Sequence, residues 1–466
     1  MIEVTSFAGR SVALFGLGGS GIATAKALVA GGARVAAWDD AQRSRDRAVA
    51  AGIALSDLTT ADWSTFDCLV LAPGLPLTHP EPYWTVRAAN DANIEIIGDL
   101  ELLACERRAR PTGVGVDCPI IAVTGTNGKS TTVSLITHLL RHAGRDVQLG
   151  GNIGTPVLAL EPPVPGRTYV VECSSFQIDL TPGLAPDVGV LMNIAPDHLD
   201  RHGSMDNYVA IKTRLVAAAR NAVIGVDDDI SATIAVQLDD GLGRVKRVSS
   251  TKGVENGVYA EGTILYEVVK GEAHKVADLS GIDTLRGAHN AQNAVAAFAA
   301  LRLLGLEAET ISAGLASFPG LPHRMEIVGR LGKVLFVNDS KATNADAAQR
   351  ALSSFDHIYW IAGGRAKTGG IDNLTNWFDR IVHAYLIGEA AERFAGTLGE
   401  AVPSSMSRTL EAALGEATRA ASADTHGEPV VLLSPACASY DQYSSFEERG
   451  DAFRAAVAGI EGVEVA

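Results

Sequence analysis

Residues 120–131 read IIAVTGTNGKST and predict a strand, a loop and the first turn of a helix. The four leading apolar residues are typical of a buried strand, and helical periodicity follows the loop. Such a unit directs several backbone N–H groups and a helix N-terminus toward one point, which forms an anion site. Lys129 adds a positive charge for phosphate oxygens, and the hydroxyl of Ser130 or Thr131 can ligate Mg²⁺. The segment therefore predicts binding of a nucleoside triphosphate.

The loop matches a shortened form of the phosphate-binding motif. Val123 stands where the general pattern has glycine. The alternative, a glycine-rich turn that binds nothing, is disfavoured.

Composition narrows the partners and the compartment. A length of 466 residues, at about 150 per domain, suggests about three domains. The formal net charge is −15 and no basic block offsets it, so nucleic acid and anionic membrane surfaces are not expected as partners. The 5 cysteines include no C-x-x-C pair and indicate a reducing cytoplasm. No apolar run approaches the roughly 18 residues that a membrane helix needs.

The N-terminal segment carries a second nucleotide signature. A predicted strand at 11–15 is followed by GLGGSG at 16–21, a helix to about Ala30 and a second strand at 34–38. Asp39 lies 18 residues beyond the last glycine of this G-x-G-x-x-G pattern. The pattern predicts a diphosphate at the helix N-terminus and a ribose or base near Asp39. It is also compatible with NAD, so a dehydrogenase remains an alternative.

Strands alternate with helices in the rest of the chain, which predicts mostly parallel, doubly wound sheets. Residues 244–279 break this rhythm with short strands and glycine turns, and they predict a small antiparallel patch. The predicted fold class is α/β, with domains at 1–110, 111–320 and 321–466. The other predicted strands are at 168–172, 188–193, 222–226, 334–337, 358–361, 384–387 and 430–433, and a helix is predicted at 290–304.

Two polar groups follow strands of the middle domain. Glu172 stands at a strand end beside the phosphate loop and is well placed as a Mg²⁺ ligand, although it could instead cap a turn. The later segment NIAPDHLDRH, 193–202, holds two acids and two histidines within six residues, Asp197 to His202. That clustering favours metal binding or acid–base chemistry.

Lys212 falls on the apolar face of a predicted helix, among Tyr208, Ile211 and Leu215, whereas Arg214 points away. A lysine on a buried face must snorkel, pair or be modified. Burial favours the neutral amine, which is the form that reacts with CO₂ to give a carbamate. From the residues alone, snorkelling is the preferred explanation.

In the third domain, cations and hydroxyls gather at strand ends and suit a small, doubly charged carboxylate. Together the motifs resemble the Mur ligases, and the resemblance runs in order through essentially the whole chain. The motifs are GLGGSG, APGL, GDLEL, TGTNGKST, GGNIG, ECSSFQ, DHLDRH, GLPHR, NDSKATN and SPACASYDQ. The family also has a shortened phosphate loop, which accounts for Val123.

The subgroup resemblance is to the members that add D-glutamate. Asn127 argues against the L-alanine-adding members, which have histidine there. The diaminopimelate- and lysine-adding members lack the N-terminal glycine pattern. Another Mur-type ligase with a different amino acid remains an alternative, as does a nucleotide-binding module without activity. Ala41 departs from the basic residue that the better-known form has two positions after Asp39.

The resemblance implies three domains: a Rossmann-like N-terminal domain that holds a UDP-sugar, a central ATPase domain and a Rossmann-like C-terminal domain. It also implies roles for individual residues. The catalytic residues that the resemblance implies are Lys129, His198 and Lys212. The ATP site comprises Gly125, Thr126, Asn127, Gly128, Lys129, Ser130, Thr131, Asn290, Asn293, Arg324 and Asp339. The UDP-substrate site comprises Gly18, Gly19, Ser20, Asp39, Gly74, Asn152 and His198. The D-glutamate site comprises Thr343, Lys367, Ser439 and Phe446.

The implied cofactors are ATP and Mg²⁺ at two sites. Ser130 and Glu172 would hold one ion, and His198 with a carbamylated Lys212 would hold the other, which reverses the preference for snorkelling. The implied partners are UDP-N-acetylmuramoyl-L-alanine and D-glutamate, joined through an acyl phosphate by a cytoplasmic enzyme that is expected to be a monomer.

Overall fold

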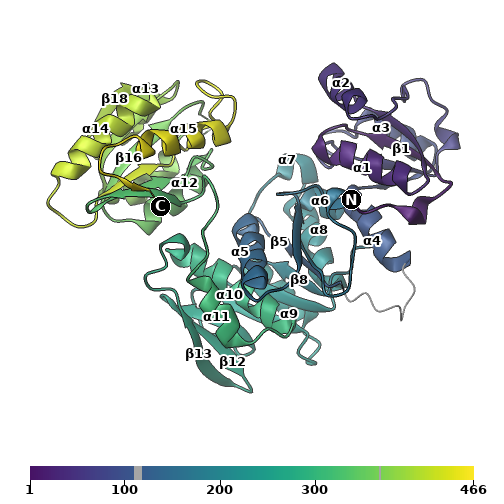
Figure 1. Ribbon diagram of the computed structural model, residues 1–466, viewed down its shortest axis with the longest axis horizontal. Coiled ribbons are helices and arrows are strands. Elements are labelled where there is room, and N and C mark those ends of the chain that lie inside the picture. The colour runs from purple at the N-terminus through teal and green to yellow at the C-terminus, as the bar shows by residue number, and fades with distance from the viewer. Residues whose placement is uncertain (110–117, 367–368, 466) are drawn as a thin grey trace. The chain divides into compact units, whose positions relative to one another are not determined.

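The structure is a computed structural model that describes residues 1–109, 118–366 and 369–465 (Figure 1). The chain forms two compact units. Unit 1 comprises Met1–Asp278 and Ala291–Ser317, and unit 2 comprises Leu279–Asn290 and Phe318–Ala466. The described residues form three sheets, of four, nine and seven strands, which are mostly parallel. The predicted α/β class is thereby confirmed, whereas the domain boundaries at 110 and 320 stay predictions.

The first sheet of unit 1 is fully parallel, with the strand order β2-β1-β3-β4. The predicted strands at 11–15 and 34–38 are confirmed as β1 and β2. Its strands are β1 Ser11–Phe15, β2 Arg34–Trp38, β3 Cys68–Leu71 and β4 Glu95–Ile97. Its helices are α1 Gly19–Ala30, α2 Gln42–Ala50, α3 Trp84–Asp91 and α4 Asp99–Ala109, with 3₁₀ turns η1 Thr5–Phe7 and η2 Trp63–Thr65.

The second sheet of unit 1 has the order β13-β12-β11-β10-β9-β8-β5-β7-β6. Strand β5 lies between β8 and β7 and is parallel to both. Every residue of these three strands is buried, as expected for a parallel sheet that helices cover on both faces. The strands are β5 Ile120–Thr124, β6 Val147–Gly151, β7 Thr168–Glu172, β8 Val188–Leu191, β9 Asn221–Gly225, β10 Val245–Ser249, β11 Gly257–Glu261, β12 Ile264–Val269 and β13 Glu272–Asp278.

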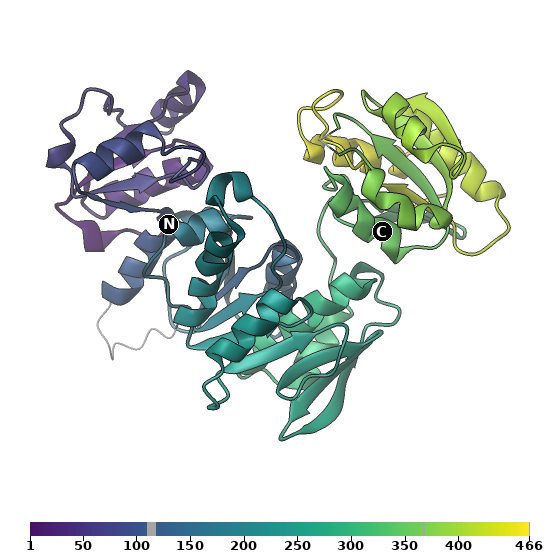
Figure 2. The same ribbon diagram turned by 180° about the vertical axis from the view of Figure 1, so that it is seen from behind.

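The helices of this part begin with α5, which directly follows the phosphate loop. They are α5 Lys129–His142, α6 Ser175–Asp179, α7 Leu199–His202, α8 Met205–Ala218, α9 Asp229–Leu238, α10 Ala288–Leu303 and α11 Ala308–Leu315, with η3 Val157–Ala159. The antiparallel patch predicted at 244–279 is only partly right. Strands β11, β12 and β13 are antiparallel and extend from the sheet edge in Figures 1 and 2, but β10 pairs in parallel with both β9 and β11. Burial of Val245 and Val248 makes β10 a continuation of the parallel sheet.

Unit 2 contains one sheet with the order β18-β17-β16-β19-β15-β14-β20. The first five strands in this order, β18 to β15, are parallel, whereas β14 is antiparallel to both β15 and the edge strand β20. The strands are β14 Glu326–Leu331, β15 Val334–Asn338, β16 Ile358–Gly363, β17 Ile381–Ile387, β18 Ser404–Arg408, β19 Val430–Leu433 and β20 Glu464–Val465. The helices are α12 Ala345–Ser354, α13 Ala391–Leu398, α14 Leu410–Ala423 and α15 Phe446–Ala458, with η4 Asp283–Leu285 and η5 Asp372–Arg380.

The carboxyl ends of parallel strands position the polar loops within each unit, which is where open α/β sheets bind ligands. In unit 1 these loops follow β1, β3, β5, β7 and β8, and in unit 2 they follow β15, β16 and β19. Across the described ranges, we find no helix with the length and apolar character needed to span a bilayer.

Candidate functional site

The loop between β5 and α5 requires glycine at two positions. Gly125 has a φ of 148° and Gly128 a φ of 84°, a region that side chains disfavour. A Cβ atom on Gly125 would lie 2.8 Å from the Cβ of Met192, and one on Gly128 would lie 2.5 Å from Oδ1 of Asn293. Both glycines therefore let the loop pack tightly against its neighbours.

Residues of the β8 loop brace the phosphate loop. The backbone N–H groups of Thr126 and Asn127 donate to the backbone and side-chain oxygens of Asn193, each at 2.9 Å. The side chain of Asn193 donates in turn to Gln292 at 3.0 Å. Neither Asn193 nor Gln292 was assigned a role from the sequence, although Asn193 opens the motif that contains His198. The structure thus adds two residues that hold the loop.

Lys129 and Lys212 converge on the phosphate loop. Nζ of Lys129 donates to the carbonyl oxygens of Gly125 and Thr126, at 2.8 and 2.9 Å. Nζ of Lys212 donates to the same Gly125 oxygen at 2.8 Å and to Oγ1 of Thr124 at 3.2 Å. Lys212 is 1% exposed. Burial, and next the charge of Lys129, lower the pKa of Lys212 to about 7. Snorkelling to the surface is therefore wrong, because the amine remains in the interior.

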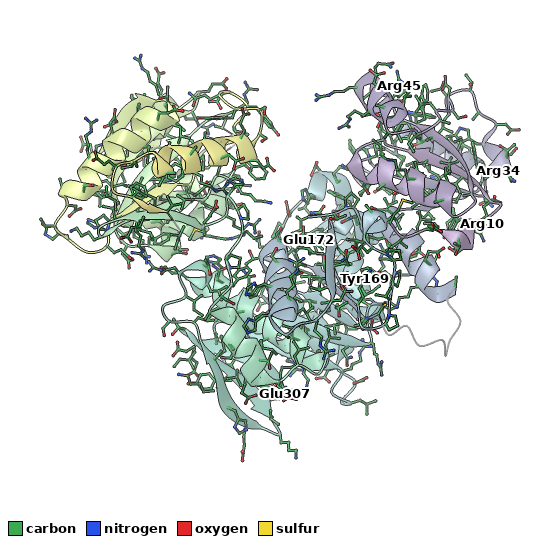
Figure 3. All side chains as sticks on the ribbon, in the orientation of Figure 1. Arg10, Arg34, Arg45, Tyr169, Glu172 and Glu307 are labelled. Atoms are coloured by element: carbon green, nitrogen blue, oxygen red, sulfur yellow. The ribbon has the colours of Figure 1, made fainter. Side chains whose placement is uncertain are left out.

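Glu172 ends β7 close to the phosphate loop (Figure 3). It is 1% exposed, and its Oε1 accepts a hydrogen bond from Nδ2 of Asn152 at 2.7 Å. Its Oε2 is buried and has no hydrogen-bond partner among the described residues. A buried carboxylate oxygen without a partner is costly, and a cation would compensate it. This donor set therefore fits Mg²⁺, with the largely buried Ser130 at the start of α5 as a companion ligand.

The two histidines of the β8 loop occupy different environments. His198 caps α7 with a φ of 52°, and its half-exposed side chain lies 3.4 Å from Asp197. His202 is buried, with Nε2 2.9 Å from Oγ of Ser175 and its ring stacked on Phe176. Burial, followed by the charges of His198 and Lys212, lowers the pKa of His202 to about 4. His198 is therefore the accessible imidazole, a distinction that sequence alone did not make.

Three or more His, Cys, Asp or Glu side chains do not gather into a metal site anywhere in the described ranges. This finding does not test the predicted metal ligands, because Glu172 and His198 are the only two of them that belong to these residue types. The remaining ligands would be the Ser130 hydroxyl, a carbamate on Lys212 and the phosphates themselves.

The glycines of the loop between β1 and α1 have two different structural roles. A Cβ atom on Gly21 would overlap the carbonyl oxygen of Gly16, so this pair allows α1 to pack against the strand end. A Cβ atom on Gly18 or Gly19 would meet nothing within 4 Å. These two glycines border open space at the N-terminus of α1, as expected for a diphosphate cradle.

Ser20, on α1, and Asp39, in the loop after β2, both form hydrogen bonds within the protein. The Ser20 hydroxyl donates to the carboxylate of Asp99, whose pKa is raised by burial. Asp39 accepts backbone hydrogen bonds from Leu17 at 2.7 Å and Ala41 at 2.8 Å. Asp39 therefore shapes the loop in addition to its predicted ligand role, and Asp99 is a supporting residue that the GDLEL motif contained.

The predicted nucleotide residues of unit 2 centre on Asp339, which follows β15. It is 5% exposed, and its two oxygens accept from Oγ of Ser434 at 2.8 Å and from the N–H of Met325 at 3.2 Å. Burial raises the pKa of Asp339 to about 7 against the opposing charge of Arg324. Asn290 is buried and donates to the carbonyl of Arg286 at 3.0 Å. Asn290 belongs to unit 2, whereas Asn293, on the same helix, belongs to unit 1.

The residues predicted for D-glutamate also lie in unit 2. Ser439 is buried in the loop after β19, and Thr343 is half-buried in the loop after β15. Phe446 begins α15, and Nζ of Lys341 lies 5.2 Å from the centre of its ring. Lys367 lies outside the described residues.

Arg449 connects two of these loops and was not identified from the sequence. It is 1% exposed and donates to Oγ and the carbonyl oxygen of Ser340, both at 2.9 Å, and to the carbonyl of Cys437 at 3.1 Å. Its place on the inward face of α15, beside Gly450 and Phe453, was the available signal.

The chain is similar to known proteins along most of its length. The Mur ligase middle domain matches residues 123–301, and the Mur ligase glutamate ligase domain matches residues 323–437. UDP-N-acetylmuramoylalanine–D-glutamate ligase of Rhizobium meliloti (strain 1021) is 58% identical over 465 residues, which cover 100% of both chains. The enzyme of that name from Brucella abortus (strain 2308) is 60% identical over 464 residues, 99% of this chain and 98% of the relative.

The solved structures share little sequence identity with this chain, so they support its fold alone. UDP-N-acetylmuramate-alanine ligase from Thermotoga maritima superposes with a TM-score of 0.57 at 15% identity, over 95% of this chain and 98% of the other. A pseudomurein peptide ligase type C from Methanothermus fervidus gives a TM-score of 0.52 at 20% identity, over 92% of this chain and 97% of the other.

Proposed function

The chain belongs to the Mur ligase family, and from that membership we infer that it adds D-glutamate to UDP-N-acetylmuramoyl-L-alanine in an ATP-dependent step of peptidoglycan precursor synthesis. The observation that carries this function is identity of 58–60% over essentially the full length with ligases named for that reaction. The family membership removes the two alternatives outside it, the dehydrogenase and the inactive nucleotide-binding module.

The reaction forms an amide bond in two steps. An oxygen of the alanyl carboxylate attacks the γ-phosphorus of ATP, and ADP leaves to give an acyl phosphate. The amine of D-glutamate then attacks the acyl carbon, and the tetrahedral adduct expels inorganic phosphate. Because acyl phosphates hydrolyse readily, the bound intermediate must be kept from water until the amine attacks.

The proposed ATP site uses the phosphate loop of unit 1. The N–H groups at the start of α5 would bind phosphate oxygens, and Lys129 would move from its loop carbonyls to the transferring phosphoryl group and neutralise its charge. In unit 2 we assign Asn290, Arg324 and Asp339 to the nucleotide, and in unit 1 Asn293. Asn293 is 2% exposed and accepts from Oγ1 of Thr132 at 3.2 Å, which supports a place beside the loop.

The proposed metal ligands are Ser130 and Glu172 for one Mg²⁺, and His198 with a carbamate on Lys212 for a second. Bound Mg²⁺ supplies positive charge that stabilises the phosphoryl group during transfer. Oε2 of Glu172, which has no hydrogen-bond partner within the described part of the chain, supports the first assignment. The buried amine of Lys212, with its pKa lowered to about 7, supports carbamylation because the neutral amine is the nucleophile toward CO₂.

The proposed UDP-substrate site comprises the open glycine cradle at the start of α1, Gly74, Asn152 and His198, with Ser20 and Asp39 shaping the cradle. We assign the D-glutamate site to Thr343, Lys367, Ser439 and Phe446 in unit 2. The proposal is completed by a monomeric enzyme of the cytoplasm, where its 5 cysteines would stay reduced.

The decisive experiment incubates the protein with ATP, Mg²⁺, UDP-N-acetylmuramoyl-L-alanine and D-glutamate, and measures phosphate release while each component is omitted in turn. We expect release only when all four are present, together with one new UDP-linked product. Release that depends on another amino acid, and not on D-glutamate, would instead identify a Mur ligase of different specificity.

A further inference from the structure

Within unit 1, a short helix beside the second sheet is hydrogen-bonded to a loop of the first sheet. Helix α7 follows His198, and the loop that follows β3 contains Gly74. Nη1 of Arg201, on α7, donates a hydrogen bond to the carbonyl oxygen of Gly74 at 2.9 Å. His198 and Gly74 are both residues that we assign to the UDP-substrate.

The guanidinium of Arg201 also packs against an aromatic ring. Its central carbon lies 4.7 Å from the centre of the Phe176 ring on α6. Nε of Arg201 is buried and has no hydrogen-bond partner in the described ranges of the chain. A buried donor without a partner costs free energy, so packing alone does not explain an arginine here.

The other end of α7 meets the same loop. Gly203 has a φ of 77°, and a Cβ atom on it would lie 2.5 Å from Cε1 of His79. Helix α7 is therefore seated against residues 74–79 at two points, one polar and one steric. Pro73, Leu75 and Leu77 line one small pocket together with Phe176, Arg201 and His202, so the two loops meet there as well.

We propose that Arg201 is a positioning residue for the UDP-substrate, which sets the Gly74 loop relative to the His198 loop so that both contact the same bound molecule. The inference rests on the proposed function. Arginine suits this role because its planar group stacks on a ring and donates in its plane at the same time. A lysine has a compact ammonium and no planar fork, so it does not reproduce both contacts.

The test compares Arg201→Lys and Arg201→Met with a matched control, Arg214→Met. Arg214 also attaches to α6, with Nη2 2.9 Å from the carbonyl of Ile178 and 3.0 Å from Oδ1 of Asp179. We expect the KM for UDP-N-acetylmuramoyl-L-alanine to rise about tenfold in both Arg201 variants, as for a lost hydrogen bond from a charged group. The KM values for ATP and D-glutamate should stay within about twofold in those variants. The control should keep all three KM values.

Several outcomes would overturn the proposal. The first is an unchanged KM for the UDP-substrate in a folded Arg201 variant, and the second is a normal KM for that substrate in Arg201→Lys. The third is an equal rise in all three KM values together with lower thermal stability, which indicates a purely structural role. Arg201→Lys keeps the charge and most of the stem, so it provides the folded variant if Arg201→Met does not fold. Failure of the proposed function is a separate result, because it would already appear as absent D-glutamate-dependent phosphate release in the unmodified protein.

Discussion

Lys212 and Lys129 donate hydrogen bonds to one and the same acceptor, the carbonyl oxygen of Gly125, each at 2.8 Å. Two ammonium groups so close together repel one another, and this repulsion adds to burial in lowering the pKa of Lys212. The arrangement is relieved if an anion binds at the loop or if Lys212 loses its positive charge. The phosphate loop is therefore built to receive negative charge from a ligand, a modification or both.

Replacement of Lys212 tests the carbamate directly. We expect Lys212→Ala to be inactive, and a short carboxylic acid added from solution to restore part of the activity by occupying the vacated ligand position. Lys212→Arg should stay inactive and resist rescue, because arginine keeps the positive charge and fills the space. The measurement is D-glutamate-dependent phosphate release with and without the added acid. An active Lys212→Arg enzyme would contradict the carbamate.

Lys129→Ala should remove turnover and leave the fold intact. A hydrogen bond to a charged group contributes about 1.5–3 kcal/mol, which corresponds to about 10- to 100-fold before any further preference for the transition state. Thermal unfolding should be nearly unchanged, because Lys129 is only partly buried. Lys252→Ala, at an exposed lysine of the same unit, is the control. A variant that retains more than half of the normal rate would remove the phosphate-loop assignment.

Gly18→Val should weaken the UDP-substrate and spare ATP. The space beside Gly18 is open and its φ of −68° is ordinary, so valine should fit the fold but block the approach of a diphosphate. Gly253→Val is a matched control, since a Cβ atom there also meets nothing within 4 Å. Calorimetry with each nucleotide checks the prediction. Loss of ATP binding with normal UDP-substrate binding would show that the two sites are assigned to the wrong sheets.

Asp339→Asn should lower turnover and raise stability at neutral pH. Burial raises the pKa of Asp339 from 3.8 to about 7, so the folded protein binds a proton that the unfolded chain has released. The carboxylate therefore destabilises the protein increasingly as the pH rises from about 4 to 7, and each pKa unit corresponds to about 1.4 kcal/mol as an upper bound. Urea unfolding from pH 4 to 8 should show the variant more stable at pH 8, with the difference vanishing near pH 4. If the variant and the unmodified protein were equally stable at both pH 4 and pH 8, the inference that Asp339 is a buried carboxylate with a raised pKa would be contradicted.

Most of the fold could be predicted because the spacing of apolar residues along the sequence shows which faces of a strand or helix are buried. The strands at 11–15, 34–38, 168–172 and 430–433 were predicted with the bounds that the structure has. Helix α5 begins at Lys129, before the periodic residues, because its first turn is polar and faces the loop. Strand β10 was misjudged because the pairing direction depends on which strand lies alongside it, and local sequence does not record that neighbour.

The site was predicted less completely than the fold. The phosphate loop was found because its anion-binding groups are consecutive in sequence. Asn193, Asp99 and Arg449 were missed because each acts through a residue far away in the chain, such as Ser340 for Arg449. Arg201 belongs with them, since its contact with Gly74 spans 127 positions.

The sequence by itself determined that this chain is an α/β protein with a phosphate loop, a diphosphate loop and the motif order of a Mur ligase. Those properties depend on short segments whose chemistry is local. Only the tertiary structure decided that Lys212 is buried against Gly125 and that Oε2 of Glu172 finds no partner among the residues that the structure describes. It also decided that His198, and not His202, is accessible. The reason is physical: burial and hydrogen bonding depend on what other strands and helices bring alongside a residue, and these effects set its charge and its availability to a ligand.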